Sequence, residues 1–256
     1  MKIVGISLVK DEERFVALAL TNALALCDWI DVIDNASRDA TPRILRRLKT
    51  AFPGRISVRR QPDLLRTHEA VRRYVGTNTW LFGVDGDEVY DPVGLRQLRE
   101  RILSGEFAGD WMVRAHFCHV CALQNGTARG WLAPPSHDPS KLYNMRLVEA
   151  WPSDPARPLF HGEGLRLRDG MTYFERHRAL NRELSWEASP FRCLHMRFVP
   201  RSIVDPSDVN RLARPRLNPN DLTFLARTRQ GVNERLEYRR GDEVTVSTAP
   251  FGLEAR

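Results

Sequence analysis

Three carboxylic acids follow an apolar run near the middle of the chain. Residues 80–84 (WLFGV) lead directly into Asp85-Gly86-Asp87-Glu88. An apolar run that ends in a sharp polar turn is typical of a buried strand in an α/β sheet, and open α/β sheets bind ligands at the carboxyl ends of their strands. Neighbouring carboxylates repel one another, so a cation must offset them, and Mg²⁺ and Mn²⁺ prefer carboxylate oxygens. The stretch favours a divalent-metal site; an ordinary acidic turn is the alternative.

Acidic side chains also end two earlier predicted strands. Residues 2–9 form a strand-like segment that runs into Asp11 and Glu12, and residues 29–33 form another that runs into Asp34. Because parallel strands meet at one edge of a sheet, we expect the three turns to converge on a single site.

The hydrophobic periodicity alternates between strand and helix over the first hundred residues, which predicts a mainly parallel sheet with right-handed crossovers. A Thr-Pro pair predicts the start of the second helix, with Thr41 as its N-cap. The expected strands are 2–9, 29–33, 56–59 and 80–84, and the expected helices are 15–24, 41–52, 65–76 and 93–103.

The pattern becomes less regular after residue 105. We expect strands at 111–120, 143–149 and 164–167, a short strand or turn at 193–198, a long loop at 124–144, and helices at 173–187 and 221–230. We therefore divide the chain into a ligand-binding half (1–105), a second half of the same domain (106–200) and a C-terminal extension with little core (201–256).

Composition indicates an anionic partner. The 256 residues carry a formal net charge of +7, mostly from arginine, which suits nucleotide phosphates, nucleic acid or an acidic membrane surface, or simply a basic solvated surface. Met1 leads straight into a strand-like segment, and no apolar run approaches the roughly 20 residues of a membrane span. We expect a cytoplasmic protein, in contact with a membrane at its inner face if at all.

Four irregularly spaced cysteines argue for a reducing compartment rather than a disulfide framework. Cys118, Cys121, Cys193 and His195 allow a zinc site as an alternative. The flanking residues look like a strand, on which Cys118 and Cys121 would point to opposite faces, so this alternative is disfavoured.

Three motifs now stand in order, each at a strand end: VKDEE (9–13), VIDNASRDAT (32–41) and VDGDE (84–88). Together they resemble family 2-like glycosyltransferases with the nucleotide-sugar-binding GT-A fold, a mixed, mainly parallel α/β sheet flanked by helices. The third motif resembles the DxD motif of that family. The likeness is clear over residues 1–105 and absent beyond about 200.

The resemblance implies roles for individual residues. Asp87, Asp85 and His195 would hold Mn²⁺ or Mg²⁺, although His195 is equally well an ordinary core histidine. The residues that would bind the nucleotide-sugar are Asp11, Glu12, Asp34, Asn35, Ser37, Arg66, Asp85 and Gly86.

Catalysis by inversion requires a base for the acceptor hydroxyl. By the same resemblance Glu163 is the first choice, with His161 orienting the base or binding the acceptor, and Asp154 and Glu149 are the alternatives. Trp131 would stack on an acceptor sugar or pack its loop. Arg146 would order the site or contact the acceptor or phosphate; a salt bridge to Glu88 is its structural alternative.

The expected function is metal-dependent transfer of a sugar from a UDP-, GDP- or dTDP-linked donor to a glycan, a lipid-linked sugar or a cell-envelope polysaccharide precursor. We expect no specific nucleic-acid partner. A nucleotidyltransferase on a similar sheet, or a non-catalytic basic protein that binds nucleic acid or membrane, are the alternatives. A nucleotidyltransferase is disfavoured because Lys10-Asp11-Glu12 stands where a glycine-rich phosphate loop is expected.

Overall fold

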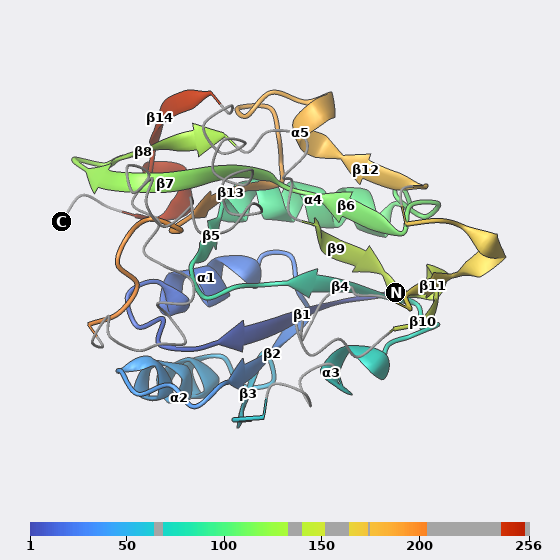
Figure 1. Ribbon diagram of the computed structural model, residues 1–256, viewed down its shortest axis with the longest axis horizontal. Helices are drawn as coiled ribbons and strands as arrows, with labels where there is room; N and C mark the ends of the chain where they lie inside the picture. Colours follow the sequence, from blue (N-terminus) through green and yellow to red (C-terminus); the bar gives the residue numbers. More distant parts are fainter. Residues whose placement is uncertain (64–68, 133–139, 152–163, 174, 204–241, 254–256) are drawn as a thin grey trace, which may run out of the picture.

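A computed structural model describes residues 1–63, 69–132, 140–151, 164–173, 175–203 and 242–253 (Figure 1). Within these ranges a seven-stranded sheet has the order β12-β6-β9-β4-β1-β2-β3. A five-stranded sheet has the order β14-β8-β7-β13-β5, and β10 and β11 form a small pair. The predicted mixed α/β fold with a mainly parallel central sheet flanked by helices is confirmed.

The elements of the larger sheet and its helices are β1 Lys2–Val9, α1 Val16–Ala23, β2 Trp29–Asp34, α2 Thr41–Ala51, β3 Ile56–Arg60, α3 Glu69–Arg72, β4 Thr79–Gly83, α4 Pro92–Leu103, β6 Met112–Arg114, β9 Ser140–Asn144, β12 His177–Ala179 and α5 Leu180–Glu183. The remaining elements are β5 Glu88–Tyr90, β7 His116–Gln124, β8 Thr127–Leu132, η3 Met145–Leu147, β10 Val148–Ala150, β11 Arg166–Leu167, η4 Arg168–Gly170, β13 Arg192–His195, β14 Glu243–Ser247 and η5 Ala249–Phe251.

The parallel centre of the larger sheet brings three strand ends to one edge. β1 lies between β2 and β4 and is parallel to both. Val9 at the end of β1 pairs with Asp34, and Ile6 pairs with Gly83, so the turns that follow β1, β2 and β4 share that edge. The convergence expected from the sequence follows from this register.

Alternation along β1 divides the core between the two faces of the sheet. Ile3 and Val9 join the cluster that contains buried residues of α1, α2 and α4, whereas Val4 and Ile6 join the cluster that contains α3. Successive side chains of a strand point to opposite faces, and both faces here are covered, which explains why β1 is apolar throughout.

The smaller sheet covers one end of the larger one and has its own apolar cluster. Val89, Cys118 and Leu194 pack there with Phe251 of η5. β14 pairs with β8, so residues 242–253 belong to this sheet and its core. The prediction of a tail with little core is wrong for these residues, and the helix predicted at 221–230 lies outside the described residues.

Other expectations need correction, among them the strand at 143–149, which η3 divides. The segment 173–187 is not one helix, because its described part forms β12 and the short α5; its dense charges leave no continuous apolar face. The loop predicted at 124–144 contains β8 and part of β9, and the strand predicted at 111–120 divides into β6 and β7 in different sheets. Thr41 is not an N-cap, since its hydroxyl accepts a hydrogen bond from the Glu12 backbone N–H.

The helix predicted at 65–76 is too long, because in its described part, 69–76, only Glu69–Arg72 are helical, as α3. Among the described residues, no helix has the length and apolar character needed to cross a membrane.

Gly130 lets β8 lie tightly against β7. A Cβ atom at this position would lie 2.8 Å from the His119 carbonyl carbon and closer still to its oxygen, and neither backbone atom is free to move. We expect Gly130→Ala to lower the free energy of unfolding by roughly 1–3 kcal/mol through overpacking, measured by urea denaturation. Gly109→Ala is the matched control, because a Cβ there meets nothing within 4 Å. Equal stabilities of the two variants would contradict this account.

Candidate functional site

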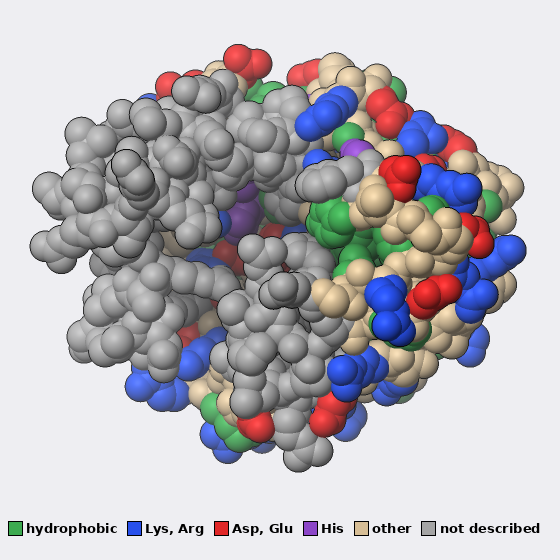
Figure 2. Space-filling view, turned by 45° about the vertical axis from the view of Figure 1, so that its right-hand side comes forward, with side chains coloured by type: hydrophobic (Ala, Val, Ile, Leu, Met, Phe, Trp, Pro, Cys, Tyr) green, Lys and Arg blue, Asp and Glu red, His purple; other side chains and the backbone are tan. Residues whose placement is uncertain are grey.

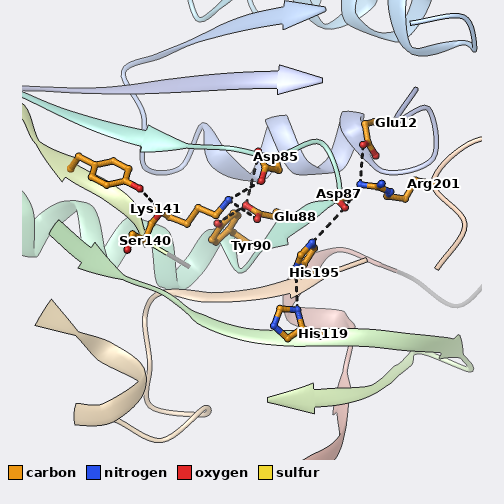
Figure 3. Close-up of polar contacts among 11 residues, drawn as sticks. Glu12, Asp85, Asp87, Glu88, Tyr90, His119, Ser140, Lys141, His195 and Arg201 are labelled. Atoms are coloured by element: carbon orange, nitrogen blue, oxygen red, sulfur yellow. Dashed lines mark hydrogen bonds and ion pairs between the residues drawn. The ribbon is translucent and has the colours of Figure 1, made fainter. Parts of the chain in front are cut away.

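The candidate site lies where the chain passes from the larger sheet to the smaller one. Residues 84–87 leave β4 and enter β5, which pairs with β13 so that Glu88 lies opposite His195. The Met196 backbone N–H donates to the carbonyl of Asp87 at 2.9 Å. This pairing brings the acidic turn and His195 together, as Figure 3 shows.

Lys141 of β9 neutralises one half of the acidic turn. Its Nζ lies 2.8 Å from Asp85 Oδ2 and 2.7 Å from Glu88 Oε1 (Figure 3). The Tyr90 hydroxyl donates to the other Glu88 oxygen at 2.9 Å. Burial disfavours the charge of Lys141, but the two carboxylates outweigh it and raise its pKa.

Glu88 is almost completely buried, and desolvation raises its pKa to about 8, although Lys141 opposes this shift. Asp85 and Asp87 add to the increase because like charges disfavour ionisation. Glu88 is therefore the group in this turn whose protonation changes near neutral pH.

Arg201 neutralises the other half of the turn. Its Nη1 contacts the carboxylate of Asp87 and lies 3.1 Å from Glu12 Oε1 (Figure 3). Burial alone would raise the pKa of Asp87, but Arg201 and His195 hold it well below its usual range. Arg201 thus connects the turn after β4 to the turn after β1.

His195 faces Asp87 with one ring nitrogen and His119 with the other. Its Nε2 lies 3.5 Å from Asp87 Oδ2, and its Nδ1 lies 3.0 Å from Nδ1 of His119 on β7. Burial lowers the pKa of His195 despite the nearby Asp87 carboxylate, so the ring favours its neutral form. A neutral imidazole is the form that ligates metals.

The turns after β1 and β2 are held together by their own side chains. The Asp11 backbone N–H donates to Ser37 Oγ at 2.9 Å, and Asp11 Oδ1 accepts from the Arg38 backbone N–H at 2.6 Å. The Ser37 backbone N–H donates to Asp34 Oδ1 at 3.0 Å, and the Asn35 amide donates to the carbonyls of Gln61 and Pro62. These predicted nucleotide-binding residues lie together and build the edge of the site.

Gly86 permits the closest approach between the first and third turns. A Cβ atom on Gly86 would lie 2.8 Å from Glu12 Cγ and 3.1 Å from Val9 Cγ1. A larger residue would separate Glu12 from the acidic turn. On the face shown in Figure 2, histidine, acidic and basic side chains are visible close to one another.

The zinc alternative finds no support in the described part of the chain. There, no group of three or more His, Cys, Asp or Glu side chains is arranged to hold a metal ion. Cys118 is buried and Cys121 is partly exposed, as expected for a strand. Burial raises the pKa of Cys118 to about 12, which disfavours the thiolate that zinc requires.

Other predicted residues lie elsewhere. Trp131 is in β8 and packs edge-to-face on Phe198 at 5.9 Å. Arg146 is exposed in η3, the short helix that directly follows Asn144. Asn144 pairs with Trp80 near the start of β4, so η3 lies away from the carboxyl edge of the sheet. The salt bridge proposed between Arg146 and Glu88 is wrong, because Lys141 takes that place.

Among the remaining predictions, Glu149 is exposed in β10. Arg66, Asp154, His161 and Glu163 lie outside the described residues. Three site residues were missed from the sequence, namely Lys141, Arg201 and His119, and each reaches the site through strand pairing or chain return rather than through a motif.

No protein-family model matches the chain, and neither does any curated protein sequence. Among solved structures, the chain is similar to S. aureus TarS 1–349, with 16% identity over 57% of this chain and 48% of that one and a TM-score of 0.39; the TarS complex with UDP gives 0.38. It is also similar to M. tuberculosis glucosyl-3-phosphoglycerate synthase in complex with Mn²⁺, UDP and glucosyl-3-phosphoglycerate, with 19% identity and a TM-score of 0.32. That match covers 45% of this chain and 44% of the synthase, so the chain spans about half the length of these structures or less.

Removing Lys141 tests the charge balance of the turn. In Lys141→Met the carboxyl groups of Asp85 and Glu88 lose their cation, and a buried pair broken on one side costs about 3–5 kcal/mol. We expect a loss of this kind in urea denaturation at pH 9, above the pKa of Glu88 in the wild type, and partial recovery when Glu88→Gln is added. Lys49→Met on the exposed side of α2 is the control and should keep wild-type stability. A Lys141→Met variant as stable as this control would refute the assigned role.

Proposed function

We propose that this chain is a nucleotide-sugar glycosyltransferase whose donor binds across the carboxyl ends of β1, β2 and β4. The observation that carries the proposal is the meeting of buried Glu12 and Asp87, the partly exposed Asp85, and His195 at that edge. Such an edge is where α/β sheets bind nucleotides. The VKDEE, VIDNASRDAT and VDGDE motifs supply the family resemblance.

The donor types at the site suit a divalent metal, although no three of the described His, Cys, Asp and Glu side chains are already grouped to hold one. Asp87 and His195 face each other, and carboxylate oxygen with imidazole nitrogen is a donor set suited to Mn²⁺. Among the described residues, Lys141 and Arg201 pair with the four carboxyl groups of Glu12, Asp85, Asp87 and Glu88. Carboxylates gathered in this way suit a hard divalent cation.

In this proposal Asp87 and His195, with Asp85 from the same turn, hold Mn²⁺ or Mg²⁺. When bound, the metal stabilises the negative charge that develops on the departing diphosphate. Asp11, Glu12, Asp34, Asn35 and Ser37 shape the nucleoside side of the site, and Arg66 faces the diphosphate or the sugar.

The reaction moves one sugar. The acceptor hydroxyl oxygen forms a bond to the anomeric carbon while the bond from that carbon to the diphosphate oxygen breaks, and its electron pair leaves with the nucleoside diphosphate. The hydroxyl proton passes to a carboxylate base, for which Glu163 is our choice, oriented by His161. Attack from the face opposite the leaving group inverts the anomeric centre.

The acceptor class we propose is a glycan, a lipid-linked sugar or another cell-envelope polysaccharide precursor. α2 supports peripheral contact with an anionic membrane surface: Arg43, Arg46, Arg47 and Lys49 are exposed, and none pairs with an acid among the described residues. Membrane-proximal basic residues attract anionic lipid headgroups.

Nucleotide binding tests the proposal. We expect one of UDP, GDP and dTDP to bind with micromolar affinity in calorimetry with Mn²⁺, and far more weakly with EDTA. Loss of a residue that only supports a metal ligand weakens metal binding by up to about 100-fold. Asp87 is itself a proposed ligand, so Asp87→Asn should weaken the metal-dependent binding by at least about 100-fold. Asp169→Asn, an exposed acid in η4 whose positive φ asparagine tolerates, is the matched control.

Two outcomes would contradict the proposal. If no nucleoside diphosphate binds with or without metal, the glycosyltransferase function is excluded. If only nucleoside triphosphates bind, the nucleotidyltransferase alternative is favoured instead.

A further inference from the structure

His119 is a buried polar side chain in the middle of an apolar strand. It is 1% exposed, and its neighbours Cys118 and Val120 are buried in the core of the smaller sheet. The parallel pairing of β7 with β13 places it directly beside His195, with ring centroids 5.1 Å apart. Burying a polar ring costs more free energy than burying an apolar side chain at the same position. The histidine therefore indicates a role for its ring nitrogens.

The contact between the two rings uses a single proton. Nδ1 of His119 lies 3.0 Å from Nδ1 of His195, so one nitrogen donates and the other accepts. When His195 Nδ1 carries the proton, His195 Nε2 has a free electron pair on the side facing Asp87. When His119 Nδ1 carries it, the His195 proton lies on Nε2 and blocks a metal there.

We propose that His119 is a positioning residue that accepts the Nδ1 proton of His195 and thereby presents His195 Nε2 to a divalent metal shared with Asp87. The inference rests on the proposed metal-dependent function. A metal-bound histidine needs a partner for its second ring nitrogen, and that partner fixes both its tautomer and its orientation. His119 supplies this partner from the neighbouring strand.

The test compares three variants by titrating Mn²⁺ alone, without nucleotide, and following free Mn²⁺ by electron paramagnetic resonance. His119→Phe fills the space but cannot accept a proton, and we expect Mn²⁺ to bind about 10- to 100-fold more weakly. His119→Asn places a carbonyl oxygen near the former Nδ1, so affinity should stay close to that of the wild type.

His116→Phe is the matched control, because His116 is also buried in β7 but packs against Trp186 at 5.3 Å instead of His195. Its Mn²⁺ affinity should equal that of the wild type. If His119 had only a structural role, Mn²⁺ affinity would fall in the same order as stability, which is measured in parallel by thermal denaturation. We expect the opposite order: His119→Asn should be less stable than His119→Phe but should bind Mn²⁺ more tightly.

Each result decides the inference. Mn²⁺ affinity that is lost in His119→Phe and kept in His119→Asn supports it. Equal affinity in wild type and His119→Phe, or an equal loss in His119→Asn or His116→Phe, overturns it while leaving the metal site intact. If the wild type itself binds no Mn²⁺, the proposed metal site fails together with the inference.

Discussion

The arrangement of the site depends on charge compensation at the junction of two sheets. Asp85, Asp87 and Glu88 follow one another almost directly, and the burial of Asp87 and Glu88 makes the repulsion among the three carboxylates expensive. Lys141 holds Asp85 and Glu88, and Arg201 holds Asp87. Without these two cations the acidic turn could not pass between β4 and β5 in its present form.

The two cations differ in how they are fixed. Lys141 lies on β9, which pairs with β4 itself, so its position is set by the central sheet. Arg201 lies beyond β13 on a segment that contacts the turns after β1 and β2: Ser202 Oγ donates to Asp39 Oδ2 at 2.7 Å, and the Ile203 backbone N–H donates to Glu13 Oε1 at 2.7 Å. Lys141 is therefore positioned by the central sheet, and Arg201 is positioned by the loops around the site.

The sequence predicted the acidic half of this site but not its basic half. Strands β1, β2 and β4 were recognisable because each is an apolar run with an abrupt polar end, and parallel topology then brought Asp11, Asp34 and Asp85 to one edge. The contacts of Lys141 with Asp85 and of His119 with His195 join residues 56 and 76 positions apart, which periodicity within a segment does not encode. Arg201 was one arginine among many in a basic chain, and only the structure brings it to Asp87.

Arg201 connects Glu12 and Asp87, two residues to which the proposal gives different roles. Glu12 belongs to the nucleoside side of the site and Asp87 to the metal side, yet both share the Nη1 atom of one guanidinium group. In the proposed enzyme, a ligand that drew Glu12 away from Arg201 would strengthen the hold of Arg201 on Asp87, and a metal at Asp87 would leave Arg201 to Glu12 or to phosphate oxygens. Coupling of this kind is reciprocal by thermodynamic necessity. In the proposed enzyme the affinities for donor and metal are therefore properties of one charge network, and neither is set by its own contacts alone.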